Sequence, residues 1–334
     1  MKIAVLGTGT WGIALSRVLF LNGHEITAWS KFPEEIQALN KTRTSPNLTG
    51  IRIPEGIQFT SDPAETVMNA EFILVVVPSI YIRETVRTFA PYTAGLDPVW
   101  INAAKGIESD TLYTLSEVIE DELKKSGIIQ PKITAISGPT HAEEVAIDKP
   151  TLIVAAGKEE HARLVQQLFE GSCIRPYTNP DIRGVQICGA LKNVEALAVG
   201  VARGLGYGDN TRAAMITRGM EEIRRLGLAM GCQERTFFGL AGIGDLIVTA
   251  TSDHSRNNRC GMLIGQGIPV KEAIRQIGMV VEGVNALPAA VKLCRKYGMD
   301  MPLIEAVRQV VEENARPDEI VRDLMSRKLK REID

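Results

Sequence analysis

The residue best placed for acid–base chemistry is Lys192, because it lies in a segment that is otherwise largely apolar. Residues 187–199 read I-C-G-A-L-K-N-V-E-A-L-A-V, and a helix that is apolar nearly all round is normally buried. Burial disfavours the charged ammonium, so the pKa of such a lysine falls toward the working range of an acid–base catalyst. The alternative is a lysine whose stem packs while its ammonium reaches water.

A dinucleotide-binding pattern stands at the start of the chain. Gly7, Gly9 and Gly12 follow a short apolar run, and they open a helical stretch after which a second strand is expected. In that context G-x-G-x-x-G is a fingerprint in which the loop and the helix N-terminus, here with Thr10 and Trp11, hold a pyrophosphate. The alternative, a sharp turn that binds nothing, does not explain the complete strand–turn–helix context.

The end of the second expected strand bears on which cofactor is bound. It reads A-W-S-K-F, and no carboxylate occurs before Glu34 to hold a ribose 2′-hydroxyl. Lys31 carries a charge that suits a 2′-phosphate. The sequence therefore predicts NAD or NADP as the cofactor and favours acceptance of NADP, unless Lys31 is an ordinary surface lysine.

Strands and helices alternate through the first half of the chain. Helical patterns are clearest at 11–21, 111–125 and 159–169. Strand–helix alternation predicts a mainly parallel sheet covered on both faces, and the continuous run F-I-L-V-V-V is typical of a central strand. The expected strands are 2–6, 25–29, 72–77, 99–103, 133–137, 151–155 and 173–177.

After about residue 181 the β signal ends and apolar residues recur at helical spacing. The fold class predicted is α/β, with an N-terminal Rossmann-type domain over residues 1–182 and a C-terminal all-α, substrate-binding domain over 183–334. A chain of 334 residues agrees with two domains. The expected helices of the second domain are 185–204, 211–230, 270–278, 284–297 and 302–313, with Asp209 and Asn210 as N-cap candidates.

Composition excludes several classes of function. The net charge of −2 provides no broad basic field for nucleic acid or an anionic membrane. The five cysteines are odd in number and form no C-x-x-C pair, which indicates free thiols rather than a disulfide framework or a zinc site. We expect a cytoplasmic protein without a membrane anchor or a metal.

Polar clusters interrupt apolar segments where strands or helices are expected to end. Each has a simpler alternative: Lys105 as a loop charge, Asp245 as a helix cap, and Ser255-Arg256-Asn257 as a polar loop. Polar groups after parallel strands lie where such sheets bind ligands. The clusters are Asn102–Gly106, Ser137–Thr140, Lys192-Asn193, Gly239–Asp245, Ser255–Asn257 and Met279–Gly283.

Taken together, these clusters resemble the soluble NAD(P)-dependent glycerol-3-phosphate dehydrogenases of bacterial type, in the family's order from about residue 2 to residue 305. The family often has Ser where this chain has Thr10, Ala104 and Thr140, and none of these changes removes a charged group. The segments that carry the resemblance are G-T-G-T-W-G, A-A-K-G-I-E, S-G-P-T-H-A-E-E, G-A-L-K-N-V-E-A-L-A-V-G, G-L-G-Y-G-D-N-T-R-A-A, G-L-A-G-I-G-D-L-I-V-T, T-S-D-H-S-R-N and M-V-V-E-G-V.

The resemblance implies reversible reduction of dihydroxyacetone phosphate by NAD(P)H to sn-glycerol 3-phosphate, which supplies phospholipid synthesis. It implies that Lys192 is the proton donor and acceptor, that Lys105 adds positive charge, and that Asp245 orients Lys192. Glu195, three residues beyond Lys192, is an alternative partner on the helix surface. The family also implies a homodimer.

The resemblance further implies the binding residues. Two rivals remain open: a dehydrogenase of the same architecture acting on a hydroxy acid or acyl-CoA, and a dinucleotide sensor without turnover. The glycine pattern and the end of the second expected strand give the cofactor contacts Gly7, Gly9, Thr10, Trp11, Gly12 and Lys31, and the resemblance adds Lys105, Gly138, Ala142, Arg256, Val280 and Glu282. The implied substrate contacts are Lys105, Gly138, Thr140, Lys192, Asn193, Asp245, Ser255, Arg256 and Asn257.

Overall fold

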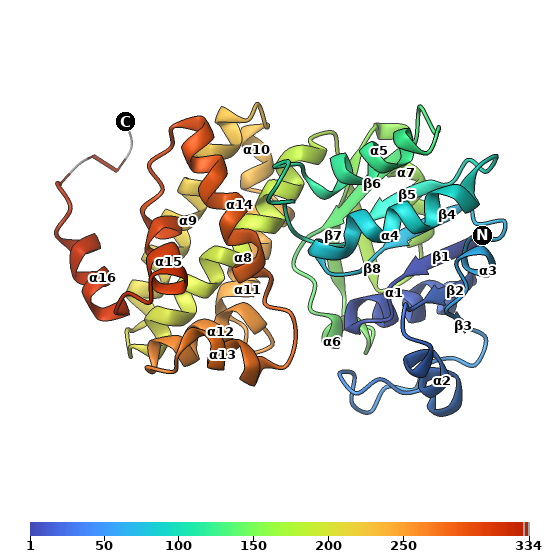
Figure 1. The fold of residues 1–334 in the computed structure, drawn as a ribbon, viewed down its shortest axis with the longest axis horizontal. Coiled ribbons are helices and arrows are strands. Elements are labelled where there is room, and N and C mark those ends of the chain that lie inside the picture. Colours follow the sequence, from blue (N-terminus) through green and yellow to red (C-terminus); the bar gives the residue numbers. More distant parts are fainter. Residues whose placement is uncertain (330, 333–334) are drawn as a thin grey trace.

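The computed structural model describes residues 1–329, 331 and 332, which form a sheet part and a helical part side by side (Figure 1). The sheet has the order β3-β2-β1-β4-β5-β6-β7-β8. Neighbouring strands are parallel except β6 and β7, so the mainly parallel sheet is confirmed. The strands are β1 (Lys2–Leu6), β2 (Glu25–Trp29), β3 (Gln58–Thr60), β4 (Phe72–Val75), β5 (Val99–Asn102), β6 (Lys132–Ser137), β7 (Thr151–Gly157) and β8 (Ile174–Asn179).

Helices cover both faces of this sheet because its central strands are apolar on both sides. In β1, Ile3 and Val5 pack into one apolar cluster with α1, α2, α6 and α7, while Ala4 and Leu6 pack into another with α3, α4 and α5. Successive side chains of a strand point to opposite faces. These elements are α1 (Thr10–Leu21), α2 (Pro33–Thr42), α3 (Pro63–Val67), η1 (Ser79–Tyr81), α4 (Ile82–Phe89), η2 (Ala90–Thr93), α5 (Leu115–Lys125), α6 (Ala142–Val145) and α7 (Glu159–Leu168).

Beyond β8 the described elements are helical. The sequence did not predict α12, where Arg256 and Asn257 lie, and the expected N-caps Asp209 and Asn210 are wrong because Gly208 caps the helix that begins at Asp209. Residues 330, 333 and 334 of the expected second domain lie outside the described residues. The elements are α8 (Ile182–Gly204), α9 (Asp209–Ala229), α10 (Glu234–Phe237), the π-helical turn η3 (Leu240–Gly244), α11 (Asp245–Thr251), α12 (Arg256–Gly265), α13 (Val270–Ile277), α14 (Glu282–Tyr297), α15 (Pro302–Glu312) and α16 (Pro317–Met325).

Helix α8 is the core of the helical part (Figure 1). By length and composition it is apolar enough to cross a bilayer, but 94% of that window is buried inside the protein. Its Gly200 and Gly204 meet Gly261 and Gly265 of α12, and a Cβ on any of the four would lie 2.1–2.2 Å from a backbone oxygen of the other helix. The two backbones therefore touch, which fixes α12 relative to Lys192.

The sheet brings the polar segments of the first half to one edge. Strands β1, β4, β5 and β6 are parallel neighbours, so the segments that follow Leu6, Val75, Asn102 and Ser137 leave from the same side. One strand was not predicted from the sequence: β3, whose three residues Gln58–Thr60 are too few to produce an alternating pattern.

Candidate active site

Lys192 lies inside the helical part with only 6% of its side chain exposed, which excludes the alternative in which its ammonium reaches water. Its Nζ is 2.5 Å from Oδ1 of Asp245 and donates to Oγ1 of Thr249 at 2.5 Å. Burial lowers the pKa of Lys192 to about 7, with the charge of Lys105 acting in the same direction and Asp245 opposing both. An amine with this pKa both gives and takes a proton near neutral pH.

Asp245 joins two lysines. Its Oδ1 faces Lys192, and its Oδ2 accepts from Nζ of Lys105 at 2.5 Å. Burial opposes ionisation of this carboxyl group, which is 1% exposed, but the two ammonium groups together lower the pKa of Asp245 below its ordinary value. Glu195, the alternative partner, packs against α9 instead, where a Cβ on Gly219 would lie 2.6 Å from its Oε2. Asp245 is therefore the ionised partner of both lysines.

Lys105 reaches this carboxylate from the segment after β5. Its Nζ also donates to the carbonyl oxygen of Gly138 at 3.0 Å, and its side chain is 19% exposed. This excludes the alternative in which Lys105 is an ordinary charged loop residue, because the ammonium of such a residue would lie in water. Two ammonium groups and one carboxylate leave the group with a net charge of +1 when both lysines are protonated.

A tight backbone turn places Asp245 at the start of α11. In η3, Gly242 has φ −91° and ψ −105°, and a Cβ there would lie 2.1 Å from the carbonyl oxygen of Phe237. No side chain fits at that position. Asp245 is the first residue of α11 and makes no side-chain cap bond, so it is not a helix cap.

The Ser255-Arg256-Asn257 cluster is the start of a helix rather than a loop. The Ser255 hydroxyl caps α12 by accepting from the backbone N–H of Asn258. The Asn257 side chain donates to Oδ1 of Asn193 at 2.9 Å and accepts from the N–H of Gly283 at 2.8 Å. The two asparagines therefore hold α8, α12 and α14 together, while Ser255 caps α12. Each of the three side chains keeps a donor hydrogen.

Arg256 is the charged residue of the Ser255-Arg256-Asn257 cluster. It remains accessible to solvent, and within the described residues no hydrogen bond or ion pair to its guanidinium occurs. Surrounding protein lowers the pKa of Arg256, while Glu282 and Glu143 oppose that effect. A guanidinium beside a helix N-terminus is a combination that suits an anion.

The glycine-rich turn after β1 has the form that a dinucleotide requires. Gly7 has φ +126°, and a Cβ on Gly12 would lie 2.0 Å from the Gly7 carbonyl oxygen, whereas a Cβ on Gly9 would meet nothing within 4 Å. The buried hydroxyls of Thr8 and Thr10 have no partner among the described residues. Open space at Gly9 and two unpaired hydroxyls beside the N-terminus of α1 fit a pyrophosphate.

The remaining expected contacts lie around the two lysines. The Gly138 carbonyl oxygen accepts from Lys105 and, at 3.2 Å, from the hydroxyl of Thr140. Glu282, the first residue of α14, accepts from the N–H and hydroxyl of Ser79 in η1. This contact joins the helical part to the segment after β4. Ala142 packs in the sheet core, and Trp11 and Val280 are partly exposed.

Lys31 follows β2 and its charge already has a partner. Its Nζ lies 2.7 Å from Oε1 of Glu84 on α4, with 64% and 62% of the two side chains exposed. An exposed ion pair contributes only about 0–1 kcal/mol, so a phosphate can compete for Lys31. Glu84 nevertheless adds negative charge at that position.

Three residues near the lysines were missed from the sequence as parts of the site. Thr249 lies four residues after Asp245 on α11 and bonds Lys192. Ser79 binds Glu282. His141, whose Nε2 is buried without a described partner, lies with its ring centroid 5.6 Å from that of His254. A polar residue four positions from a candidate carboxylate on an apolar helix was the available signal for Thr249.

Fold and site together define a class: two-domain oxidoreductases in which a Rossmann-type sheet holds NAD(P) and a helical part supplies the proton-transfer group. Comparison with known proteins narrows this class. Residues 2–163 match the family model described as NAD-dependent glycerol-3-phosphate dehydrogenase N-terminus, and residues 181–322 match the corresponding C-terminus.

Individual relatives agree with these matches. The chain is 52% identical over 334 residues, 99% of each chain, to glycerol-3-phosphate dehydrogenase [NAD(P)+] 2 of Lactobacillus delbrueckii subsp. bulgaricus. It is 44% identical to the Bacillus subtilis glycerol-3-phosphate dehydrogenase [NAD(P)+], over 98% of this chain and 94% of that one. The crystal structure of the Coxiella burnetii glycerol-3-phosphate dehydrogenase superposes with a TM-score of 0.92 at 33% identity, covering 98% of this chain and 99% of that one. The chain belongs to the NAD(P)-dependent glycerol-3-phosphate dehydrogenase family, and it is an oxidoreductase.

Replacing Asp245 tests the electrostatics of this site. In Asp245→Asn, Lys192 loses the carboxylate that raises its pKa, so the pKa falls further below its ordinary value. Since Lys192 must be protonated to donate, we expect the loss of kcat/KM for ketone reduction with rising pH to occur at least about one pH unit lower than in the wild type. Asp253→Asn is the control, because Asp253 is 83% exposed and pairs with Arg203. An unshifted profile in Asp245→Asn would contradict the assignment.

Proposed function

We propose that this protein reduces dihydroxyacetone phosphate to sn-glycerol 3-phosphate with NAD(P)H, reversibly, and that Lys192 transfers the proton. The observation that supports this proposal most directly is that Asp245 contacts both Lys192 and Lys105 inside the protein. A sensor that turns nothing over has no use for a buried amine whose pKa is about 7. The product is the backbone unit of glycerophospholipids.

The chemistry follows from charge. The bound reduced nicotinamide supplies the hydride that adds to the C2 carbonyl carbon. Negative charge then develops on the carbonyl oxygen, and Lys192 donates its proton there. Lys105 stabilises that oxygen through its positive charge, and Asp245 holds both ammonium groups in place. In the reverse direction neutral Lys192 accepts the proton of the C2 hydroxyl.

The phosphate of the substrate is assigned to the N-terminus of α12. Arg256 donates through a planar fork that matches phosphate oxygens. The remaining donor hydrogens of Ser255, Asn257 and Asn193 supplement it, and Thr140 contacts the substrate on the other side. Holding a remote phosphate fixes the carbonyl carbon relative to Lys192.

The cofactor is assigned to the turn Gly7–Gly12, with Thr10 and Trp11 beside the phosphates and Lys31 at the ribose. Lys105, Gly138, Ala142, Val280 and Glu282 lie toward the nicotinamide end, and Arg256 is assigned to both ligands. This assignment is supported by the open space at Gly9 and by the hydroxyl of Thr10, which is buried without a partner among the described residues.

We assign residues 1–182 to the cofactor domain and 183–334 to the substrate domain, because β8 ends at Asn179 and α8 begins at Ile182. We further propose a homodimer in the cytoplasm. The family resemblance supports the dimer, and five free cysteines suit a reducing compartment. Sedimentation of the purified protein measures the oligomeric state.

Removing the proton donor tests the proposed function directly. Lys192→Ala should lower kcat by roughly 10²- to 10⁴-fold, because a positioned general acid contributes about that factor. Binding of NADPH, followed by fluorescence titration, should change little. Retention of near-normal turnover with dihydroxyacetone phosphate would falsify the role of Lys192.

Removing the guanidinium tests the phosphate assignment. Charge-assisted hydrogen bonds contribute about 1.5–3 kcal/mol, so Arg256→Ala should raise the KM for dihydroxyacetone phosphate by roughly 10- to 100-fold. Because Arg256 is also assigned to the cofactor, turnover of unphosphorylated dihydroxyacetone is assayed in parallel at saturating NADPH, where it should stay nearly unchanged. A collapse of cofactor affinity with an unchanged substrate KM would show that Arg256 acts on the cofactor alone.

Reversing the charge at residue 31 tests the choice of cofactor. Lys31→Asp should shift the ratio of kcat/KM for NADPH over NADH toward NADH by at least about tenfold, since one charged contact of about 1.4 kcal/mol is lost. Initial rates with both cofactors measure this ratio. Equal preference in variant and wild type would place Lys31 away from the ribose 2′ position.

A further inference from the structure

The segment that carries Lys105 has little regular structure of its own. Between the end of β5 at Asn102 and the start of α5 at Leu115, the β interaction that the described residues show is an isolated bridge between Ile107 and Thr114. We call residues 103–114 the Lys105 loop. Lys105 has a flexible four-carbon stem, so the 2.5 Å contact of its Nζ with Asp245 depends on a fixed backbone.

Three consecutive residues after Lys105 anchor this loop. Gly106 packs so close to Ser79 that a Cβ on the glycine would lie 2.4 Å from the serine Cβ. Ile107 is 4% exposed and belongs to the apolar core of the helical part. Glu108, the third residue after Lys105, is the charged anchor.

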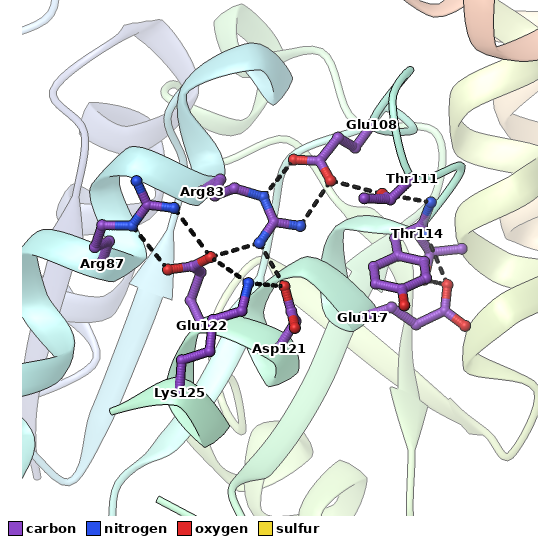
Figure 2. Close-up of polar contacts among 10 residues, drawn as sticks. Arg83, Arg87, Glu108, Thr111, Thr114, Glu117, Asp121, Glu122 and Lys125 are labelled. Carbon is purple, nitrogen blue, oxygen red and sulfur yellow. Dashed lines mark hydrogen bonds and ion pairs between the residues drawn. The ribbon is translucent and has the colours of Figure 1, made fainter. Parts of the chain in front are cut away.

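Arg83 of α4 binds the carboxylate of Glu108, as Figure 2 shows. Nε of Arg83 donates to one oxygen and Nη2 to the other, both at 2.7 Å. The hydroxyl of Thr111, within the same loop, also donates to Glu108 at 2.6 Å. A bidentate pair of this kind fixes orientation as well as distance.

The same guanidinium is fixed on its other side by α5. Nη1 of Arg83 lies 2.5 Å from Oδ2 of Asp121 and 2.5 Å from Oε1 of Glu122 (Figure 2). Burial alone would raise the pKa of Glu122, but Arg87, Arg83 and Lys125 lower it to about 2. The cluster is therefore fully ionised, and Arg83 is anchored to α5 while it holds the loop.

Arg83 and its neighbour Arg87 share the partner Glu122 but differ in exposure, since 21% of the Arg83 side chain and 64% of the Arg87 side chain are exposed. Arg83 additionally binds Asp121 and Glu108. Arg87 lies one helical turn further along α4 and also binds Glu122, at 3.0 Å, but it makes no contact with Glu108. Lys125 likewise binds only Asp121 and Glu122. Within the part of the chain that the structure describes, the ion pair from this cluster to the Lys105 loop is that of Arg83.

We propose that the Arg83–Glu108 fork positions Lys105 for the reaction, which makes Arg83 and Glu108 positioning residues that act through Lys105 without touching the substrate. The proposal rests on the proposed function, because Lys105 must act at the reacting carbonyl. Without the fork the loop loses its charged anchor three residues from Lys105, and Nζ occupies a wider range of positions around Asp245.

A displaced Lys105 changes the protonation of Lys192 in a known direction. The groups that face Lys192 are Asp245 and Thr249 from α11, Lys105 from its loop, and the ring of His141. Lys105 lowers the pKa of Lys192 and shares the carboxylate of Asp245. Its displacement therefore raises the pKa of Lys192, and the proton donor stays charged to higher pH.

Three single variants of the full-length enzyme separate positioning from simple stabilisation. Arg83→Gln removes the fork and the contacts to α5, Glu108→Gln weakens the fork from the loop side, and Arg87→Gln removes an ion pair to Glu122 alone. We expect the first two to lower kcat/KM for dihydroxyacetone phosphate by about 10- to 100-fold, with the KM for NADPH within about twofold of wild type. Their loss of activity with rising pH should begin at higher pH than in the wild type. Arg87→Gln should retain the wild-type rate and pH profile.

Further measurements keep the test decisive. If Arg83→Gln fails to fold, as judged by circular dichroism and thermal melting, Glu108→Gln carries the test because it leaves the contacts of Arg83 with α5 intact. The double variant Arg83→Gln/Glu108→Gln should be about as slow as the slower single variant, because both remove one interaction.

Rates and pH profiles of the fork variants that match Arg87→Gln would overturn the proposal, as would fully multiplicative effects in the double variant. Failure of the proposed function looks different, because wild type and Arg87→Gln would then show no turnover of dihydroxyacetone phosphate.

Discussion

The contact on which the rest of the site depends is the buried carboxylate of Asp245 between two ammonium groups. Moving a lysine out of water opposes its charge, and an unpaired buried ammonium loses its proton. Burial and the charge of Lys105 lower the pKa of Lys192, and Asp245 raises it. The resulting pKa is about 7. The pKa of Lys192, the proposed proton donor, therefore depends on its burial and on the charges of both Asp245 and Lys105.

That arrangement is assembled from segments far apart in the sequence. The sheet delivers Lys105 at the end of β5, the core helix α8 carries Lys192, and the turn η3 presents Asp245 at the start of α11. Close glycine contacts make the assembly possible, because a side chain at Gly242 would collide with the backbone of Phe237. The two parts of the chain are also joined beside the site, since Ile107 of the sheet part packs in the helical core and Glu282 of the helical part binds Ser79. The contacts that join the two parts of the chain therefore also fix the positions of Lys105, Lys192 and Asp245 relative to one another.

The parts of the fold and of the site that the sequence predicted are those whose sequence pattern lies within a few neighbouring residues. The continuous apolar run of β4 and the glycine pattern at Gly7–Gly12 are visible within a few residues, and the sheet and its turn followed from them. The apolar neighbours of Lys192 suggested its burial but left open a lysine whose ammonium reaches water. The sequence suggested Asp245 as the partner of Lys192 only through the family resemblance, because helical spacing by itself offered Glu195. The α12 helix was missed because R-N-N-R is polar and has no apolar stripe until Cys260. The Arg83–Glu108 fork joins helix α4 to a loop 25 positions further along the chain, and no pattern in one sequence encodes such a pairing.

The ionised cluster around Arg83 lies near the protein surface, but one of its ion pairs reaches the loop that carries Lys105. Exposed ion pairs usually contribute little to stability, and Arg87, with 64% of its side chain exposed, makes such a pair with Glu122. Arg83 is only 21% exposed, and it binds Glu122 as well as Glu108. Glu122, which both arginines bind, lies on a helix that its own apolar face already fixes. Glu108, which Arg83 binds, lies on a loop that is otherwise held by the packing of Gly106 and Ile107. Since that loop carries Lys105, whose charge lowers the pKa of Lys192, our proposal couples the bidentate geometry of one partly buried arginine to proton transfer through Glu108, Lys105 and Asp245 in turn.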